Sequence, residues 1–224
     1  MRIIAGEFRR RKLFSPSEKS PARPMPDVVK EAVFNLLRGH TEGMAVLDLF
    51  AGSGAIGLEA VSRGASRCVL VERDRGTLDV LRRNIEHLGV EERAEAVSAD
   101  ALGPAVVVRC PRPVHLIFCD PPYAMVRNTQ QWPRVTAQLS RLIALLDDKG
   151  YAVLRTPWPF LHERDPGRAD RDETDRFAEV GLELDGALGP ETHVYGSTAI
   201  HLYMKRRDAA STEPPTGPPT EHSA

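Results

Sequence analysis

The chain has 224 residues, of which 42% are apolar and 27% charged, an ordinary composition for one globular domain with short appendages. No apolar stretch is long enough to cross a bilayer, and the N-terminus lacks the form of a secretory signal, so we expect a cytoplasmic protein without a membrane partner. The three cysteines (Cys68, Cys110 and Cys119) cannot all pair, and none belongs to a cluster with metal-ligand spacing. The composition therefore excludes a disulfide-rich secreted domain and a zinc module, and we expect no metal.

Positive charge is concentrated at the N-terminus, although the formal net charge of the chain is only −1. Residues 1–40 hold nine Lys or Arg and four Asp or Glu, so this part carries an excess of five positive charges. A basic segment on a nearly neutral chain indicates local contact with phosphate groups, although a run of like charges is more often simply solvated. The candidate RNA-contacting residues of this segment are Arg9, Arg10, Arg11, Lys12 and Arg23.

The N-terminal residues predict a small extension ahead of the main domain. Alternating apolar and polar residues over 1–15 indicate a short hairpin, and the Pro-, Ser- and Lys-rich residues 16–26 indicate a loop. Asp27 is placed to cap a helix over 28–37, whose apolar side chains share one face. We therefore divide the chain into an extension (1–40), a main domain (41–207) and a disordered Pro- and Ser-rich tail (208–224).

From residue 44 onward, predicted strands alternate with predicted helices. The strands are expected at 44–49, 67–72, 94–99, 114–119 and 150–155, and the helices near 54–63, 75–88 and 134–146. This alternation predicts an α/β, Rossmann-like fold with a doubly wound, mostly parallel sheet. Residues 180–186 and 193–204 are expected to form a closing pair of strands that adds an antiparallel strand to the sheet.

A glycine-rich turn follows the first predicted strand. Gly52, Gly54 and Gly57 fit the pattern G-x-G-x-x-G, which by itself is a weak signal for dinucleotide binding. Glycine lets the backbone approach a ligand closely, and the N-terminus of the following helix points partial positive charge at that ligand. The turn therefore predicts either a cofactor loop or a tight strand-to-helix connection with no ligand.

Acidic residues end the next two predicted strands. Glu72 ends the second strand, about 20 residues beyond the glycines, where it can accept hydrogen bonds from ribose hydroxyls. Asp100 follows the third strand and is placed to meet an adenine amino group. Because the carboxyl ends of parallel strands meet at one edge of a sheet, we expect these acids to share a site with the glycine loop.

The tetrapeptide Asp120-Pro121-Pro122-Tyr123 follows a fourth apolar segment. Neither proline has an N–H group, so the turn offers hydrogen-bond acceptors and almost no donors. The Asp120 carboxylate and a proline carbonyl can cradle an amino group, and the Tyr123 ring offers a surface on which a planar base can stack. The turn predicts chemistry on the exocyclic amine of a nucleobase, although in isolation it is also compatible with an ordinary β-turn.

Both NAD and S-adenosylmethionine fit a glycine loop followed by a ribose-binding acid, and the turn at Asp120 separates them. A hydride-transfer enzyme needs no amine cradle at its fourth strand, whereas an amino-methyltransferase does. The chain resembles the class I S-adenosylmethionine-dependent methyltransferases, with residues 48–57 as the cofactor loop. The resemblance implies a cofactor site made of Asp48, Phe50, Gly52, Ser53, Gly54, Glu72, Arg73, Asp100 and Ala101, and a catalytic site made of Asp120, Pro121, Pro122 and Tyr123.

The N-terminal residues narrow this resemblance. Residues 2–13 are similar to the N-terminal hairpin of the bacterial small-subunit ribosomal RNA guanine-N2 methyltransferases, and Arg23-Pro24 with the helix after it resembles the family's next helix. The chain departs from the family at Met25-Pro26, where small hydroxyl residues are usual. An aromatic residue often precedes the last strand's glycine in this family, so Tyr195 is a candidate for the base pocket, whereas Trp132 and Trp158 are interpreted as packing residues.

The resemblance implies methyl transfer from S-adenosylmethionine to the exocyclic N2 of one guanine in 16S ribosomal RNA. The expected partner is this RNA within the assembling or assembled small subunit, and the expected enzyme is a monomer. Three alternatives stay open at this point. They are a DNA adenine-N6 or cytosine-N4 methyltransferase, a cytosine-C5 enzyme with Cys110 or Cys119 as nucleophile, and a non-catalytic RNA-binding assembly factor.

Overall fold

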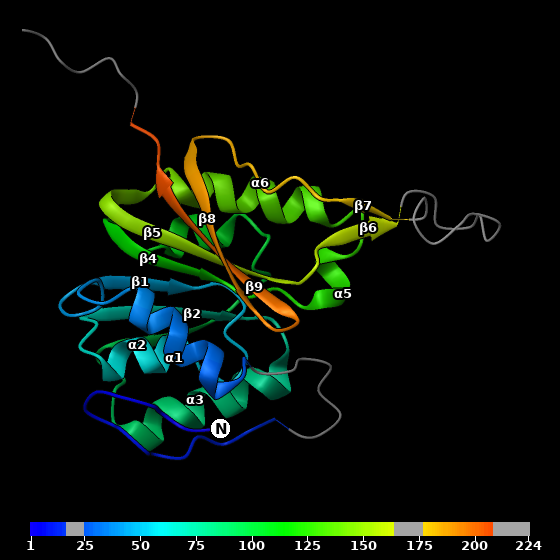
Figure 1. The fold of residues 1–224 in the computed structure, drawn as a ribbon. Coiled ribbons are helices and arrows are strands. Elements are labelled where there is room, and N and C mark those ends of the chain that lie inside the picture. Colours follow the sequence, from blue (N-terminus) through cyan, green and yellow to red (C-terminus); the bar gives the residue numbers. More distant parts are fainter. Residues whose placement is uncertain (17–24, 164–176, 208–224) are drawn as a thin grey trace, which may run out of the picture.

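A seven-stranded sheet with helices on both faces forms the centre of the protein (Figure 1). The computed structural model describes residues 1–16, 25–163 and 177–207. The strand order is β3-β2-β1-β4-β5-β9-β8, in which the first five strands are parallel, β9 is antiparallel to β5 and β8 is antiparallel to β9. The strands of this sheet are β1 (Ala45–Asp48), β2 (Arg67–Glu72), β3 (Ala94–Ser98), β4 (Val114–Cys119), β5 (Leu146–Pro157), β8 (Ala187–Tyr195) and β9 (Thr198–Lys205). The predicted Rossmann-like sheet with an antiparallel closing strand is thereby confirmed.

The helices divide between the two faces of the sheet. They are α1 (Asp27–Leu36), α2 (Gly57–Ser62), α3 (Arg75–Leu88), α4 (Ala105–Arg109), α5 (Tyr123–Val126) and α6 (Trp132–Ile143). The first three pack into one apolar cluster, in which the rings of Phe34 and Phe118 lie 5.6 Å apart. The last three pack into a second cluster on the opposite face, where the rings of Trp132 and Phe160 lie 4.9 Å apart. All six residues of β4 are buried because both faces of this central strand are covered.

Two short strands stand apart from the main sheet. They are β6 (Leu161–Glu163) and β7 (Phe177–Glu179), which pair antiparallel. Across the described ranges, no helix combines the length and the apolar character needed to span a membrane. Residues 208–224, the predicted disordered tail, and Arg23 lie outside the described residues.

Three local predictions were wrong. The closing strands expected at 180–186 and 193–204 instead lie at Ala187–Tyr195 and Thr198–Lys205, because the turn at Gly196 (φ +60°) places Tyr195 opposite Thr198. The helix expected from residue 54 begins only at Gly57. Asp27 does not cap α1, since the residue at the cap position is Pro26 and no side chain caps the helix.

The N-terminal extension is a hairpin held by backbone hydrogen bonds rather than by regular strands. A single antiparallel bridge joins Arg2 to Lys12, and the N–H of Ile3 donates to the carbonyl of Arg11 at 2.9 Å. Arg10 adopts a left-handed conformation (φ +70°) in the turn. Ile3 and Leu13 are buried in the first apolar cluster, so this hairpin is part of the main core.

A buried carboxylate, Glu59 of α2, fastens the extension to the domain. Its two oxygens accept the N–H groups of Ile4 and Ala5 at 2.7 and 3.0 Å and the Nε–H of Arg63 at 2.8 Å. The ammonium group of Lys30, from α1, lies 3.4 Å away, and both side chains of this ion pair are almost fully buried. Burial lowers the pKa of Lys30, and the charge of Glu59 opposes that shift.

We predict that Glu59→Ala destabilises the protein by about 3–5 kcal/mol, because it leaves the buried Lys30 unpaired and two backbone N–H groups without an acceptor. The matched control is Glu95→Ala, which removes exposed ion pairs with Arg67 and Arg109 and should cost less than about 1 kcal/mol. Urea unfolding of both variants measures the difference. Equal losses of stability in the two variants would contradict the anchoring role of Glu59.

Candidate methyltransferase active site

Four carboxylates lie at the carboxyl ends of four neighbouring strands. Asp48 ends β1, Glu72 ends β2, Asp100 lies two residues beyond β3 and Asp120 follows β4 directly. The strand order β3-β2-β1-β4 makes these four strand ends consecutive along one edge of the sheet. The order in which the strands are added to the sheet reverses between β1 and β4. At such a switch point, open α/β sheets bind ligands.

The glycine loop leaves room on one side and none on the other. Gly52 and Gly54 both adopt left-handed conformations, with φ of +55° and +91°. A Cβ at Gly54 would lie 2.6 Å from the Cδ1 of Leu81, so this position is closed by the core. A Cβ at Gly52 would meet no atom within 4 Å, so the backbone there faces open space that a ligand can approach.

Glu72 holds the glycine loop in place. One carboxylate oxygen accepts the N–H of Gly52 at 3.1 Å, and the other accepts the N–H of Asp74 at 2.7 Å. Each oxygen keeps a second lone pair, so these bonds leave capacity for an external hydroxyl donor. Its neighbour Arg73 is exposed.

Asp48 is completely buried beneath this loop. Its Oδ2 accepts the N–H of Gly57, the first residue of α2, at 2.9 Å, while its Oδ1 has no hydrogen-bond partner among the described residues. Burial raises the pKa of Asp48 to about 7, and the charges of Asp120 and Glu72 act in the same direction. The first N–H of α2 is therefore bound by Asp48 inside the protein.

The remaining predicted cofactor residues differ in exposure. Phe50 is half-buried against the second apolar cluster, and Ala101 is buried within it. Ser53 is buried, with its hydroxyl 3.7 Å from the sulfur of Met1 rather than directed outward. Asp100 is exposed at the strand end, where its Oδ1 accepts the N–H of Leu102 at 3.1 Å.

Asp120 forms a close ion pair with a residue that the sequence analysis did not single out. The Nε atom of Arg155, near the end of β5, lies 2.7 Å from Oδ1 of Asp120, and only 9% and 12% of the two side chains are exposed. Burial raises the pKa of Asp120 to about 6, and the positive charge of Arg155 limits that rise. The only signal for Arg155 in the sequence is a charged residue at the end of an otherwise apolar segment.

Tyr123 begins α5 and is fixed at its hydroxyl. The Tyr123 hydroxyl donates to Oγ1 of Thr198 in β9 at 2.9 Å. The Thr198 hydroxyl in turn donates to the backbone carbonyl of Thr156 at 3.0 Å. The guanidinium carbon of Arg155 lies 5.3 Å from the centre of the Tyr123 ring, and that of Arg127 lies 5.9 Å from it. The ring is therefore held by β9 and bordered by two cations.

Two further aromatic residues, Tyr195 at the end of β8 and Trp158 after β5, lie beside the turn between β8 and β9. Tyr195 is half-buried and lies opposite Thr198, the partner of the Tyr123 hydroxyl. Trp158 is 40% exposed, and its backbone N–H donates to the backbone carbonyl of Ser197 in this turn at 2.9 Å. Trp132 is buried, as the predicted packing role requires, whereas Trp158 is only partly buried and its packing role stays a prediction.

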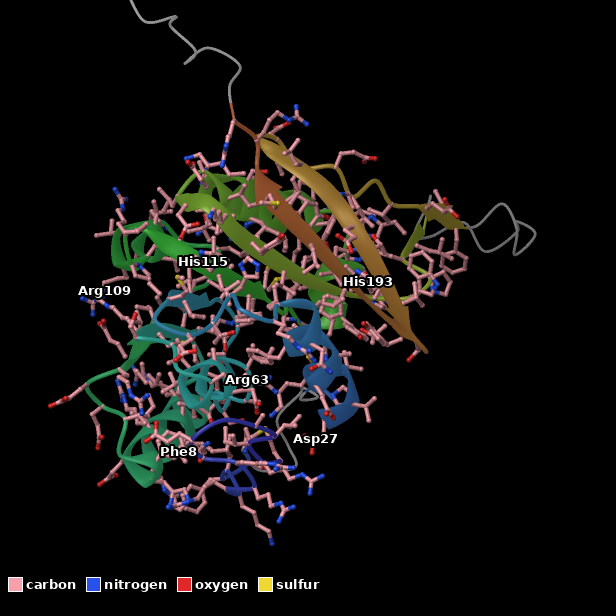
Figure 2. All side chains as sticks on the ribbon, turned by 60° about the vertical axis from the view of Figure 1, so that its left-hand side comes forward. Phe8, Asp27, Arg63, Arg109, His115 and His193 are labelled. Atoms are coloured by element: carbon pink, nitrogen blue, oxygen red, sulfur yellow. The ribbon has the colours of Figure 1, made fainter. Side chains whose placement is uncertain are left out.

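The basic run does not line the Asp120 edge. The side chains of Arg9, Arg10, Arg11 and Lys12 are all exposed on the hairpin. The N–H of Phe8, at the hairpin tip, donates to the hydroxyl of Ser62 at the far end of α2 (Figure 2). Ser62 is five residues beyond Gly57, the residue bound to Asp48, which corresponds to about 7.5 Å of helix. The structure therefore separates the basic tip from the strand-end carboxylates.

The cysteines offer no activated nucleophile. Cys68, Cys110 and Cys119 are free and buried. Burial raises the pKa of Cys110 to about 11 and that of Cys119 still further, so both are thiols at neutral pH. This argues against the cytosine-C5 mechanism. Within the described ranges, no group of three or more His, Cys, Asp or Glu is arranged to hold a metal ion.

The strand order, the antiparallel closing strand and the acids at neighbouring strand ends define a Rossmann-like methyltransferase fold. Comparisons with known proteins agree. The solved structure described as "Putative methyltransferase yhhF from Escherichia coli" superposes with a TM-score of 0.68 and 27% identity, covering 92% of this chain and 97% of that one. The chain therefore has the architecture of this class of enzyme.

Sequence comparison identifies the family. The family described as conserved hypothetical protein 95 matches residues 1–156. "Putative rRNA methyltransferase YlbH" of Bacillus subtilis is 30% identical over 92% of this chain and all of that protein. Ribosomal RNA small subunit methyltransferase D of Escherichia coli is 36% identical over 67% of this chain and 69% of that protein. The chain belongs to the ribosomal RNA small-subunit methyltransferase D family.

The raised pKa of Asp48 leads to a test of pH-dependent stability. The pKa of this carboxyl is about 7 in the folded protein against an ordinary value of 3.8, so it stabilises the fold below pH 4, and this contribution is lost as the pH rises to 7. Asp48→Asn keeps an acceptor for Gly57 but removes the titration. We predict that the free energy of unfolding of Asp48→Asn, relative to that of the wild type, increases by up to about 4 kcal/mol between pH 4 and pH 7.5. Urea unfolding across this range measures the difference, and parallel pH profiles would contradict it.

Proposed function

We propose that this protein transfers a methyl group from S-adenosylmethionine to the exocyclic N2 of a guanine in 16S ribosomal RNA. The observation that carries the proposal is the Asp120 turn, which presents a carboxylate and a proline carbonyl, and no proline N–H, beside the open glycine loop. Membership of the ribosomal RNA small-subunit methyltransferase D family supports RNA as the substrate.

The cofactor loop fits the methyl donor in shape and in hydrogen-bonding capacity. Open space above Gly52 admits a ligand, Glu72 retains lone pairs for ribose hydroxyls, and Asp100 is exposed where an adenine amino group would lie. When bound, S-adenosylmethionine supplies a methyl group on a positively charged sulfur and leaves as a neutral thioether. The residues proposed to hold it are Asp48, Phe50, Gly52, Ser53, Gly54, Glu72, Arg73, Asp100 and Ala101.

Asp120 and Pro121 act on the amine. The guanine N2 lone pair is delocalised into the ring, so the free amine is a poor nucleophile. Acceptance of its two N–H groups by the Asp120 carboxylate and the Pro121 carbonyl favours a pyramidal nitrogen and directs the lone pair toward the methyl carbon. The nitrogen becomes positively charged as the new N–C bond forms. The carboxylate stabilises that charge until a proton leaves to water.

The target base has to be unstacked to reach this turn. Tyr123 is the proposed stacking surface, held by its bond to Thr198, and contributes on the order of 1–3 kcal/mol. Pro122 is exposed at the start of α5, and Tyr195 lies across the β8–β9 turn, so both can border the base. A guanine in a single-stranded loop costs least to present in this way.

The hairpin cations and the Asp120 turn are separate surfaces, and we expect the RNA to contact both. The hairpin cations lie at the opposite end of α2 from Asp48, and Arg23 precedes α1 in the sequence. Such phosphate contacts position the RNA and do not read its sequence. The proposed substrate is 16S ribosomal RNA within the assembling or assembled small subunit. We expect a monomer of this protein to bind it.

The experiment that tests the proposed function is methyl transfer from labelled S-adenosylmethionine, followed by nucleoside mass analysis. The substrates are small subunits, free 16S ribosomal RNA and duplex DNA, all lacking the modification. N2-methylguanosine from a ribosomal substrate is the expected product. Methyladenine or methylcytosine from DNA would show that DNA, and not ribosomal RNA, is the substrate. The absence of both methyl transfer and S-adenosylmethionine binding would favour the non-catalytic RNA-binding alternative.

In the same assay, we predict that Asp120→Ala lowers turnover by at least about 1000-fold, because both the acceptor and the stabilising charge are lost. Its affinity for S-adenosylmethionine, measured by calorimetry, should stay within a few-fold of the wild type. Asp148→Ala, which removes an exposed carboxylate paired with Arg207, is the matched control and should be fully active. Wild-type turnover in Asp120→Ala would refute the proposed chemistry.

We predict that replacing Arg9, Arg10, Arg11 and Lys12 together with Ala weakens RNA binding and flattens its salt dependence, because fewer counterions are released. The matched control removes four exposed arginines elsewhere, namely Arg67, Arg82, Arg109 and Arg112. RNA affinity is measured from 50 to 300 mM salt. An unchanged salt slope in the hairpin variant, or equal changes in both variants, would contradict the assignment of the hairpin as the RNA-contacting surface.

A further inference from the structure

Arg155 and Asp120 meet because of the register between two parallel strands. Cys119 of β4 lies opposite Leu154 of β5, so the residues that follow them are neighbours at the carboxyl edge. Arg155 is buried at this point, with 7% of the residue exposed. Its partner across β9 is Ile200, so the pair is placed by the two adjacent strands and not by a loop.

The contact is a charge pair rather than an aligned hydrogen bond. Nε of Arg155 and Oδ1 of Asp120 are 2.7 Å apart, yet neither atom has a hydrogen bond of good geometry within the described part of the chain. Over the same ranges, no residue donates to Oδ2 of Asp120. Arg155 therefore fixes one oxygen of the carboxylate by charge and leaves the other free to accept an external N–H group.

Arg155 also borders the aromatic ring of the same turn. Its guanidinium carbon lies 5.3 Å from the centre of the Tyr123 ring, whose hydroxyl is bound to Thr198. One buried cation thus contacts both the acceptor carboxylate and the proposed stacking surface. A residue placed only for packing would not require a charge at this position, because burying a guanidinium group is costly unless it is paired.

We propose that Arg155 is a positioning residue that keeps Asp120 ionised and oriented, so that its free oxygen accepts the amine of the target base. This inference deepens the proposed function and rests on it for the identity of the amine. Arg155 does not itself contact the reacting atoms.

The electrostatic surroundings of Asp120 make such a partner necessary. Asp120 is buried at the end of β4, and this burial raises its pKa. Burial favours the protonated acid, which donates a hydrogen bond where an acceptor is needed. Arg127 borders the far side of the turn through the Tyr123 ring and does not pair with Asp120. Arg155 is thus the cation that opposes protonation.

The test compares Arg155→Met and Arg155→Lys with the wild type in single-turnover methyl transfer to the ribosomal substrate, with saturating methyl donor, from pH 5.5 to pH 9.5. The wild-type rate should fall as Asp120 is protonated, near its pKa of about 6. In Arg155→Met, the fall should move to higher pH by about 1–3 units. The rate at pH 6.5 then drops at least about 3-fold and recovers as the pH rises further, whereas Arg155→Lys stays near the wild-type profile.

The matched control is Arg127→Met, which removes an exposed cation beside the Tyr123 ring and should leave the pH profile unchanged. The ratio of each variant to the wild type cancels any ionisation of the RNA. An Arg155→Met profile with its fall at the wild-type pH, or lowered equally at every pH, would overturn the inference, since a structural defect does not move the profile.

A second measurement is independent of activity. The carboxyl carbon of Asp120, assigned by comparison with Asp120→Asn, is titrated by carbon NMR in the RNA-free wild type and in Arg155→Met. A higher midpoint in the variant supports the inference, and an unchanged midpoint overturns it. This titration can succeed even if no ribosomal substrate is methylated, an outcome that would refute the proposed function alone.

Discussion

A carboxylate that is taken out of water requires compensation by donors or cations, and this requirement organises the molecule. Glu59 is fully compensated, because two backbone N–H groups, Arg63 and Lys30 surround it. Asp48 has one donor for two buried oxygens, and Asp120 has a charge pair without an aligned hydrogen bond. The well-compensated acid joins the hairpin to the domain, and the poorly compensated acids both lie at the carboxyl edge of the sheet.

The short helix α2 connects these two roles. Its first N–H is bound by Asp48 at the strand edge, and Glu59 in its middle anchors the N-terminal hairpin. The hydroxyl of Ser62, at its last residue, holds the hairpin tip. This helix of six residues therefore lies between the hairpin tip and Asp48 at the strand edge.

Local sequence signals predicted the acidic strand ends, the glycine loop and the Asp120 turn, because each depends on residues that are neighbours in the chain. Arg155 was missed, since its contact with Asp120 joins positions 35 residues apart in the sequence and exists only through the register of β4 and β5. The backbone contact of Trp158 with Ser197 in the β8–β9 turn likewise joins segments that are remote in the sequence.

The sequence by itself determined the α/β fold, its parallel strand ends and the lack of proline N–H donors in the Asp120 turn, because periodicity and the missing N–H groups of two prolines are properties of short segments. Only the tertiary structure decided which oxygen of Asp120 is engaged, that the helix terminus at Gly57 is occupied by Asp48, and that the basic hairpin tip lies away from the site. These outcomes depend on distances between segments that are remote in the chain. Strand register and the burial of Glu59, Asp48 and Asp120 set those distances, and no single segment carries them.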